Sequence, residues 1–185
     1  MANIHYISTP RPGVKRGGGA AIAIHSSKFS VSKLNIPIPK PLEIVWALLR
    51  PKEHTGVIKK VILCSFYSPP NSKKNLLLID HISVTYNSLK IQHPDAAILL
   101  SGDKNNLDEK KILALNPNFR QMVRQNTRQN KILTIVISDL HMFYHNPTII
   151  PPVPVDVPGQ GVPSDHSGVQ ALHLHIRSVR LRLEK

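Results

Sequence analysis

The segment HPDAAILLSGDKNNLD, residues 93–108, leads from a buried strand into a group of polar side chains. Its centre, AAILLS, is a short continuous apolar run, which is typical of a strand buried on both faces. Asp103 and Asn105 follow directly, two residues apart, and in an extended segment they would point to the same side. A carboxylate and a carboxamide that converge there can activate a water and hold a phosphate oxygen. The same pair is also common in ordinary Asp/Asn turns.

A second polar group lies near the C-terminal end, in VPSDHSGV, residues 162–169. It places Ser164, Asp165 and His166 side by side, between a Pro/Gly-rich run and a predicted strand at 172–176. An aspartate can bind a hard cation through oxygen. A histidine can donate to a phosphate or move a proton near neutral pH. Taken alone, this motif also fits a polar turn.

The rest of the chain alternates short apolar runs with segments rich in proline, glycine and asparagine. Runs of β-branched and aromatic residues predict strands. The predicted strands lie within residues 16–26, 42–51, 59–70, 96–103, 132–140 and 172–176. Apolar residues three and four apart predict a helix over 75–91, and a short helix is predicted over 108–115. Residues 146–163 hold six prolines and are predicted to form an irregular loop.

Length and the order of these elements define the fold class. The chain has 185 residues, of which 41% are hydrophobic, enough for one domain with a real core. Many strands, few helices and long loops predict an α/β sandwich of two packed sheets with helices outside. No apolar run approaches the ~20 residues that span a bilayer. The first residues lack the apolar core of a secretory signal, and Cys64 is the only cysteine, so we expect an intracellular protein, nuclear or cytoplasmic.

Positive charge is concentrated in two blocks of the chain. The formal net charge is +13. Residues 1–60 carry ten Lys and Arg against two acids, and residues 110–134 carry six against none. Such blocks indicate a polyanionic partner, either nucleic acid or an anionic membrane surface. A solvated basic surface without a partner is the alternative.

Together and in this order, these motifs resemble the endonuclease/exonuclease/phosphatase superfamily, the fold of DNase I. Within it they resemble the endonuclease domain of non-LTR (LINE-type) retrotransposons. The resemblance covers about residues 5–172 and rests on RGGGAAIAIHS, FYSPP, HPDAAILLSGDKNNLD, QMVRQNTRQNKILTIVISDL and VPSDHSGV. It implies a DNase I-like four-layer α/β sandwich of two mixed sheets over residues 1–176, followed by a basic tail at 177–185.

The resemblance also implies a role for each matching residue. Tyr67 is implied to contact the scissile phosphate, and Asp103 to orient or deprotonate the attacking water, with Asn105 beside it. Asp165 is implied as a metal ligand or the support of one, and His166 as the group that stabilises charge on the phosphorane. The implied substrate-binding residues are Thr127, Arg128 and Ser164.

The reaction implied is hydrolysis of a DNA phosphodiester with Mg²⁺, or Mn²⁺ in its place, to neutralise charge on the phosphate. In a retrotransposon that nick primes reverse transcription. The resemblance therefore implies DNA as the partner and a reverse transcriptase module in a longer product.

Three positions depart from the family pattern. The family's metal-binding glutamate lies on an early strand, whereas residues 1–42 contain no Asp or Glu, so the first strands are expected to be missing. Glu43 is expected to be a surface acid outside the site. Thr134 stands where the family usually has an aspartate that orients the site histidine, and Lys104 replaces an apolar residue that faces the core.

These departures lead us to expect an endonuclease-like domain with weak or absent catalysis. Two alternatives stay open. One is a non-catalytic basic domain that binds nucleic acid, and the other is a phosphatase of inositol lipids or small phosphate esters.

Overall fold

The structure is a computed structural model, and it describes residues 3–11, 19–52, 58–70, 72–141, 148–150 and 168–170. Several predictions fall outside these ranges: the motif formed by Ser164, Asp165 and His166, the strand at 172–176 and the tail at 177–185. Within the described ranges, no helix combines the length and apolar composition that crossing a bilayer requires.

The described residues form ten strands and two helices. The strands are β1 (Ile4–Pro10), β2 (Gly19–His25), β3 (Phe29–Lys33), β4 (Glu43–Pro51), β5 (Val61–Tyr67), β6 (Ala97–Asp103), β7 (Arg120–Gln121), β8 (Thr134–Ser138), β9 (Thr148–Ile150) and β10 (Gly168–Gln170). The helices are α1 (Ser72–Gln92) and α2 (Glu109–Leu113).

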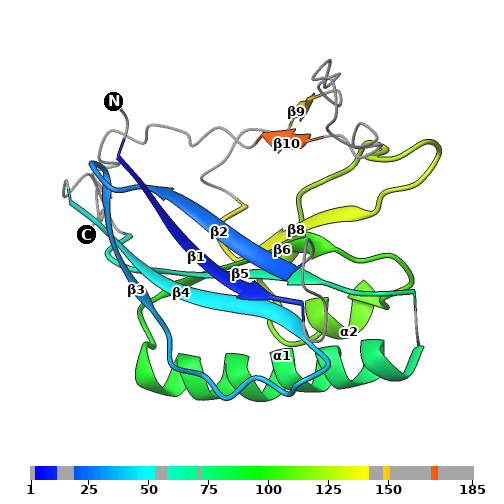
Figure 1. Ribbon diagram of the computed structural model, residues 1–185, viewed down its shortest axis with the longest axis horizontal. Coiled ribbons are helices and arrows are strands. Elements are labelled where there is room, and N and C mark those ends of the chain that lie inside the picture. The colour runs from blue at the N-terminus through cyan, green and yellow to red at the C-terminus, as the bar shows by residue number, and fades with distance from the viewer. Residues whose placement is uncertain are drawn as a thin grey trace, which may run out of the picture.

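Six of the strands form one mixed sheet in the order β3-β4-β5-β6-β8-β7. Only β5 and β6 pair in parallel, and the chain passes between them through α1. A parallel pair requires such a crossover, because a tight turn cannot return the chain to the starting edge. Figure 1 shows α1 along one face of this sheet, with β1, β2, β9 and β10 on the opposite side.

The main core lies between α1 and the sheet. Alternate residues of the central strands point to the helix, since side chains along a strand alternate between faces. On β4 these include Ile44 and Trp46, which pack with Leu78 and Ile82 of α1, and all four are almost fully buried. The predicted helical face of residues 75–91 is therefore the face that closes the core.

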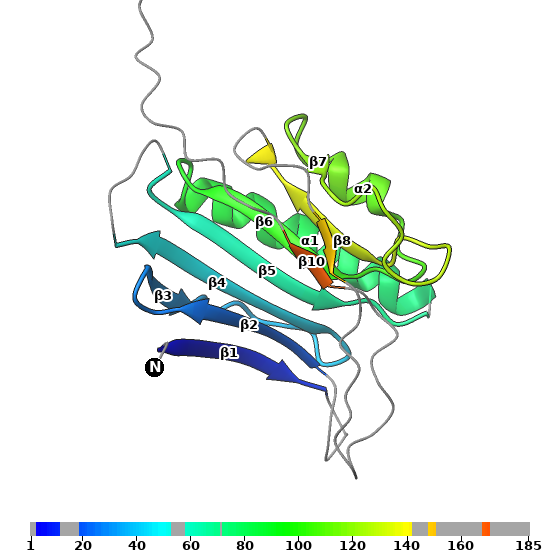
Figure 2. The same ribbon diagram turned by 90° about the horizontal axis from the view of Figure 1, so that it is seen from above.

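The other face of the sheet is covered by two short antiparallel pairs. The β1–β2 hairpin covers one part of it through Ile7, Ile22 and Ile24, which pack against residues of β4 such as Val45 and Ala47. The β9–β10 pair lies farther along the same face, near β6 and β8, as Figure 2 shows from above. The predicted α/β sandwich of two packed sheets is confirmed.

The strands predicted within residues 16–26, 42–51, 59–70, 96–103 and 132–140 are confirmed, and so are both helices. The prediction of an irregular loop over 146–163 was wrong at Thr148–Ile150, which pairs with Gly168–Gln170. The strand forms because Gly168–Gln170 supplies its hydrogen bonds, and the proline-rich composition of residues 146–163 gives no sign of this pairing. Strands β1 and β3 were not predicted, because β1 buries only Ile7 deeply and β3 buries no residue fully.

His81 of α1 is buried against Trp46, and this burial leads us to expect a fold that is sensitive to acid. The two rings meet edge to face with centroids 6.5 Å apart, and His81 is 8% exposed. No described residue offers a hydrogen bond to its Nε2. Burial lowers the pKa of His81 below 6.5, and the negative charge of Asp80 offsets part of this.

The free energy of unfolding should therefore fall as the pH drops below about 6.5. Unfolded His81 takes up a proton there while the folded residue resists it, so acid favours the unfolded state, with a slope of at most about 1.4 kcal/mol per pH unit for one proton. Urea unfolding between pH 7.5 and 5, followed by the fluorescence of Trp46, the only tryptophan, measures this slope. His81→Leu should flatten the slope and the exposed-site control His25→Gln should not. Equal slopes in the two variants would refute the prediction.

Candidate functional site at the end of the central sheet

Four neighbouring strands place one residue each in a row across the end of the sheet. In the pairing register Glu43 lies opposite Tyr67, Tyr67 opposite Asp103, and Asp103 opposite Thr134. Directly paired residues share a face, so these side chains lie side by side on the face that the β1–β2 hairpin covers. Strand spacing makes this polar row about 14 Å long.

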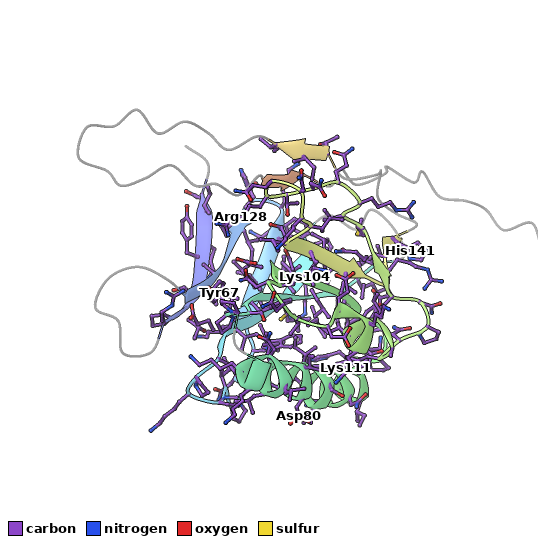
Figure 3. The ribbon with its side chains drawn as sticks, turned by 90° about the vertical axis from the view of Figure 1, so that its right-hand side faces the viewer. Tyr67, Asp80, Lys104, Lys111, Arg128 and His141 are labelled. Carbon is purple, nitrogen blue, oxygen red and sulfur yellow. The ribbon has the colours of Figure 1, made fainter. Side chains whose placement is uncertain are left out.

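The polar row is accessible at three of its four positions. Tyr67, Asp103 and Thr134 are half-buried, whereas Glu43 is buried. Figure 3 looks onto this end of the molecule and labels Tyr67, Lys104 and Arg128. The structure thus brings Tyr67 and Asp103, which are far apart in the sequence, onto adjacent strands at one end of the sheet.

Asn105 forms the turn that presents Asp103. Its φ of 41° lies in the left-handed region, which asparagine tolerates better than most residues. Its backbone N–H donates to Asp103 Oδ1 at 3.2 Å, and its Nδ2 donates to the carbonyl oxygen of Ser68 at 2.8 Å. The expectation that Asp103 and Asn105 point to one side of an extended segment was wrong, because the strand ends at Asp103 and the chain turns.

Gly102 allows β6 to approach β5 closely just before Asp103. A Cβ atom at this position would collide with the carbonyl oxygen of Phe66 and lie 2.7 Å from its ring. Phe66 is the register partner of Gly102, so its ring fills the space that a side chain would take. The glycine in the Gly-Asp motif therefore fixes where Asp103 stands relative to Tyr67.

The Thr127–Arg128 pair lies beside the far end of the polar row. The Thr127 hydroxyl accepts hydrogen bonds from the backbone N–H groups of Leu133 and Thr134, each at 2.9 Å. Both Thr127 and Arg128 donate their backbone N–H to the Lys131 carbonyl oxygen. Thr127 has no exposed surface, so in this structure its side chain supports the loop that carries Arg128. Direct contact between Thr127 and a substrate stays a prediction from the resemblance.

Glu43 is the residue that sequence reasoning misplaced. It is 7% exposed, and its carboxylate accepts from Arg11 Nε at 2.7 Å and from the backbone N–H of Gly19 at 2.8 Å. Arg11 Cζ lies 5.2 Å from the centroid of the Tyr67 ring. The hydrogen bond and charge of Glu43 raise the pKa of Arg11. The missed signal was the alternation of β4, which puts Glu43 in phase with Val45 on a buried face.

The Lys104 side chain does not enter the core and instead contacts the short helix α2. Its Nζ donates to Glu109 Oε2 at 2.8 Å, and both side chains keep about a quarter of their surface exposed, 19% and 28%. The aliphatic stem of a lysine can cover apolar surface while its ammonium stays hydrated. Lys104 is therefore paired with Glu109 and does not place an unpaired charge in the core.

The described residues do not by themselves make a magnesium site. No three His, Cys, Asp or Glu side chains converge among them. Both carboxylate oxygens of Glu43 accept hydrogen bonds, and the other acid of the row, Asp103, accepts from the Asn105 N–H. Mg²⁺ favours octahedral oxygen coordination. The predicted metal role of Asp165, the role of His166 and that of Ser164 lie outside the described residues and stay predictions.

Comparison with solved structures identifies the fold. An endonuclease/exonuclease/phosphatase family protein from Bacteroides thetaiotaomicron matches with a TM-score of 0.62 at 15% identity, over 91% of this chain and 72% of that one. The mannosyl-6-phosphatase Bt3783 of the same organism gives 0.65 at 13% identity, over 91% and 76%. D. rerio TDP2, solved with a single-strand DNA product, gives 0.56 at 14% identity, over 90% and 75%. At these identities the likeness shows the fold.

Comparison of the sequence itself found no relative. No protein-family model matches the chain, and no curated protein matches it. The chain thus has the DNase I-like endonuclease/exonuclease/phosphatase fold, as predicted, and the retrotransposon resemblance rests on the sequence motifs.

Thr127→Val should loosen the loop beside the polar row. The change keeps the shape of the side chain and leaves two part-buried backbone N–H groups without their acceptor, at a cost of about 1 kcal/mol or more in unfolding free energy. Amide exchange at Leu133 and Thr134 should quicken in the variant. The control Thr9→Val, on β1, should change stability by less than about 0.5 kcal/mol. Unchanged exchange at both amides would contradict the support assigned to Thr127.

Proposed function

We propose that this chain binds the DNA backbone at the polar row and hydrolyses DNA phosphodiesters there slowly, as a domain derived from a retrotransposon endonuclease. The observation that carries the proposal is the register of β4, β5, β6 and β8, which lines up Tyr67 and Asp103. The Thr127–Arg128 pair joins the end of this row, where Thr127 binds the backbone of Thr134. A carboxylate can act as a general base toward water, and phenol and guanidinium groups can donate hydrogen bonds to phosphate oxygens, so these residue types can support phosphoester hydrolysis.

Each residue has a defined part in this proposal. Asp103 accepts the proton of the attacking water, since a carboxylate within hydrogen-bond reach acts as a general base. The Tyr67 hydroxyl donates to a phosphate oxygen from the adjacent strand. Arg128 attracts the phosphate backbone from the loop that Thr127 holds. Asn105 holds Asp103 in position through the hydrogen bonds of the turn, as a positioning residue that does not itself contact the substrate.

A divalent cation would supply neutralisation of charge on the phosphate. The resemblance assigns it to Asp165, with His166 beside it, and the described residues add no complete set of ligands. The family's metal-binding glutamate has no counterpart in the first 42 residues. This shortage of ligands is our reason for proposing slow turnover.

Charge favours DNA over a small substrate. The net charge of +13 suits a polyanion, and the basic block at 110–134 includes Arg128, which follows Thr127 at the end of the polar row. A protein of the same fold, TDP2, was solved with a DNA product. The retrotransposon origin, and with it a reverse transcriptase module in a longer product, is supported by the order of the sequence motifs.

A phosphatase of small phosphate esters is the second candidate. It is favoured by the structural likeness to a mannosyl-6-phosphatase. The same base and phosphate-binding groups would serve a phosphomonoester, so the two candidates differ in what the surrounding surface binds. A substrate test separates them.

Asp103→Asn should reduce nicking of supercoiled plasmid by about 100-fold or more, because it removes the general base while keeping the shape of the side chain. Asp95→Asn is the matched control. Asp95 lies near the opposite end of β6, half-exposed and paired with Lys60, and its loss should leave nicking within twofold. The assay compares wild-type and both variants in magnesium buffer, beside phosphate release from a small ester.

The outcomes separate the candidates. Nicking that falls only in Asp103→Asn supports the proposal. Release of phosphate from the small ester without nicking favours the phosphatase. Salt-sensitive binding of duplex DNA, with neither activity, leaves a nucleic-acid-binding domain, since release of counterions makes such binding fall steeply with salt.

A further inference from the structure

Arg11 reaches the polar row from outside the central sheet. It follows the last residue of β1, and its side chain crosses to β4 and β5, where it meets Glu43 and Tyr67. Its side chain is 38% exposed, whereas the Glu43 side chain is 9% exposed. The guanidinium thus stands between a buried carboxylate and solvent, over the aromatic ring next to Asp103.

Two contacts fix the orientation of this guanidinium. Its Nε donates to Glu43 Oε1 at 2.7 Å, and its carbon atom Cζ lies 5.2 Å from the Tyr67 ring centroid, within the range of a cation–π contact. Glu43 is itself held, because its other oxygen accepts from the Gly19 N–H at 2.8 Å. A side chain already held in one place loses little freedom when it binds a ligand.

The guanidinium keeps donors for a further acceptor. It carries five N–H groups, of which Nε provides one. Within the ranges that the structure describes, Glu43 is the acceptor that Arg11 meets, and it takes the Nε–H. Two amino groups in a planar fork remain, and this geometry matches two oxygens of one phosphate.

The position of the fork indicates which phosphate it would meet. Arg11 lies over Tyr67, and Tyr67 is the register partner of Asp103 on the next strand, about 5 Å away. A backbone that presents one phosphate to Tyr67 and Asp103 would bring another close to Arg11.

We propose that Arg11, positioned by Glu43 and Tyr67, is a phosphate-binding residue that holds a DNA backbone phosphate next to the one at Asp103. This inference rests on the proposed function for the identity of the ligand. Glu43 offsets the positive charge of Arg11. Arg11 therefore binds phosphate mainly through the direction of its N–H donors and less through net charge. It follows that lysine, a point charge without the fork, cannot replace Arg11.

The test measures the affinity of a 20-base-pair duplex DNA at one fixed salt concentration. Arg11→Gln and Arg11→Lys should each weaken binding by about tenfold, the loss of one charge-assisted bidentate contact. The control is Arg50→Gln, on β4, which removes the same charge from an exposed position about 23 Å along the strand from Glu43. It should change affinity by less than twofold. Trp46 fluorescence checks that each variant is folded.

A second arm uses inorganic phosphate as the probe and follows the Arg11 Nε–H signal by NMR in the wild-type chain. The signal should shift with phosphate, and it should be absent from the spectrum of Arg11→Lys.

If DNA binds equally to wild-type and Arg11→Lys, the inference is overturned while the proposed function stands. If DNA does not bind but phosphate shifts the Arg11 signal, the anion subsite stands and the proposed function fails. An Arg11 signal indifferent to phosphate, together with equal losses in Arg11→Gln and Arg50→Gln, would also overturn it.

Discussion

The pairing register of β4, β5, β6 and β8 is the constraint on which the rest of the site depends. Side chains alternate with a period of two along a strand, so a slip of one residue would turn Tyr67 or Asp103 to the helix side. The register is fixed most firmly at β4, because its two faces are buried by different partners. Ile44 and Trp46 are buried against α1, and Val45 and Ala47 are buried against the β1–β2 hairpin. The apolar pattern that builds the core thereby also aligns the polar row.

The β1–β2 hairpin contributes both to the core and to the polar row. It buries the second face of β4 and, at its end, delivers Arg11 and the Gly19 N–H to the carboxylate of Glu43. A buried carboxylate is costly unless it is paired and hydrogen-bonded, and Glu43 is both. The polar row and the hairpin therefore stabilise each other, and a change at Glu43 would affect the fold as well as the site.

The sequence predicted those elements whose apolar pattern can be recognised within a single segment. The apolar runs of β4, β5 and β6 and the helical face of α1 are such segments. It missed β1, where only Ile7 is deeply buried, because so few buried positions leave no recognisable period. It missed the role of Glu43, because the burial of that carboxylate depends on Arg11, 32 residues away in the chain. The Asp103–Asn105 pair was recognised, but its geometry was not, because the same residues fit both an extended segment and an Asp/Asn turn, and the structure has the turn.

The most direct measurement is a crystal structure of the chain with a short single-stranded thymidine oligonucleotide. The polar row, if it is a phosphate site, predicts one backbone phosphate within hydrogen-bond distance of the Tyr67 hydroxyl and near Asp103. Phosphates bound at the opposite end of the sheet, where Asp139 accepts from the Ile98 N–H, with nothing at the polar row, would contradict it.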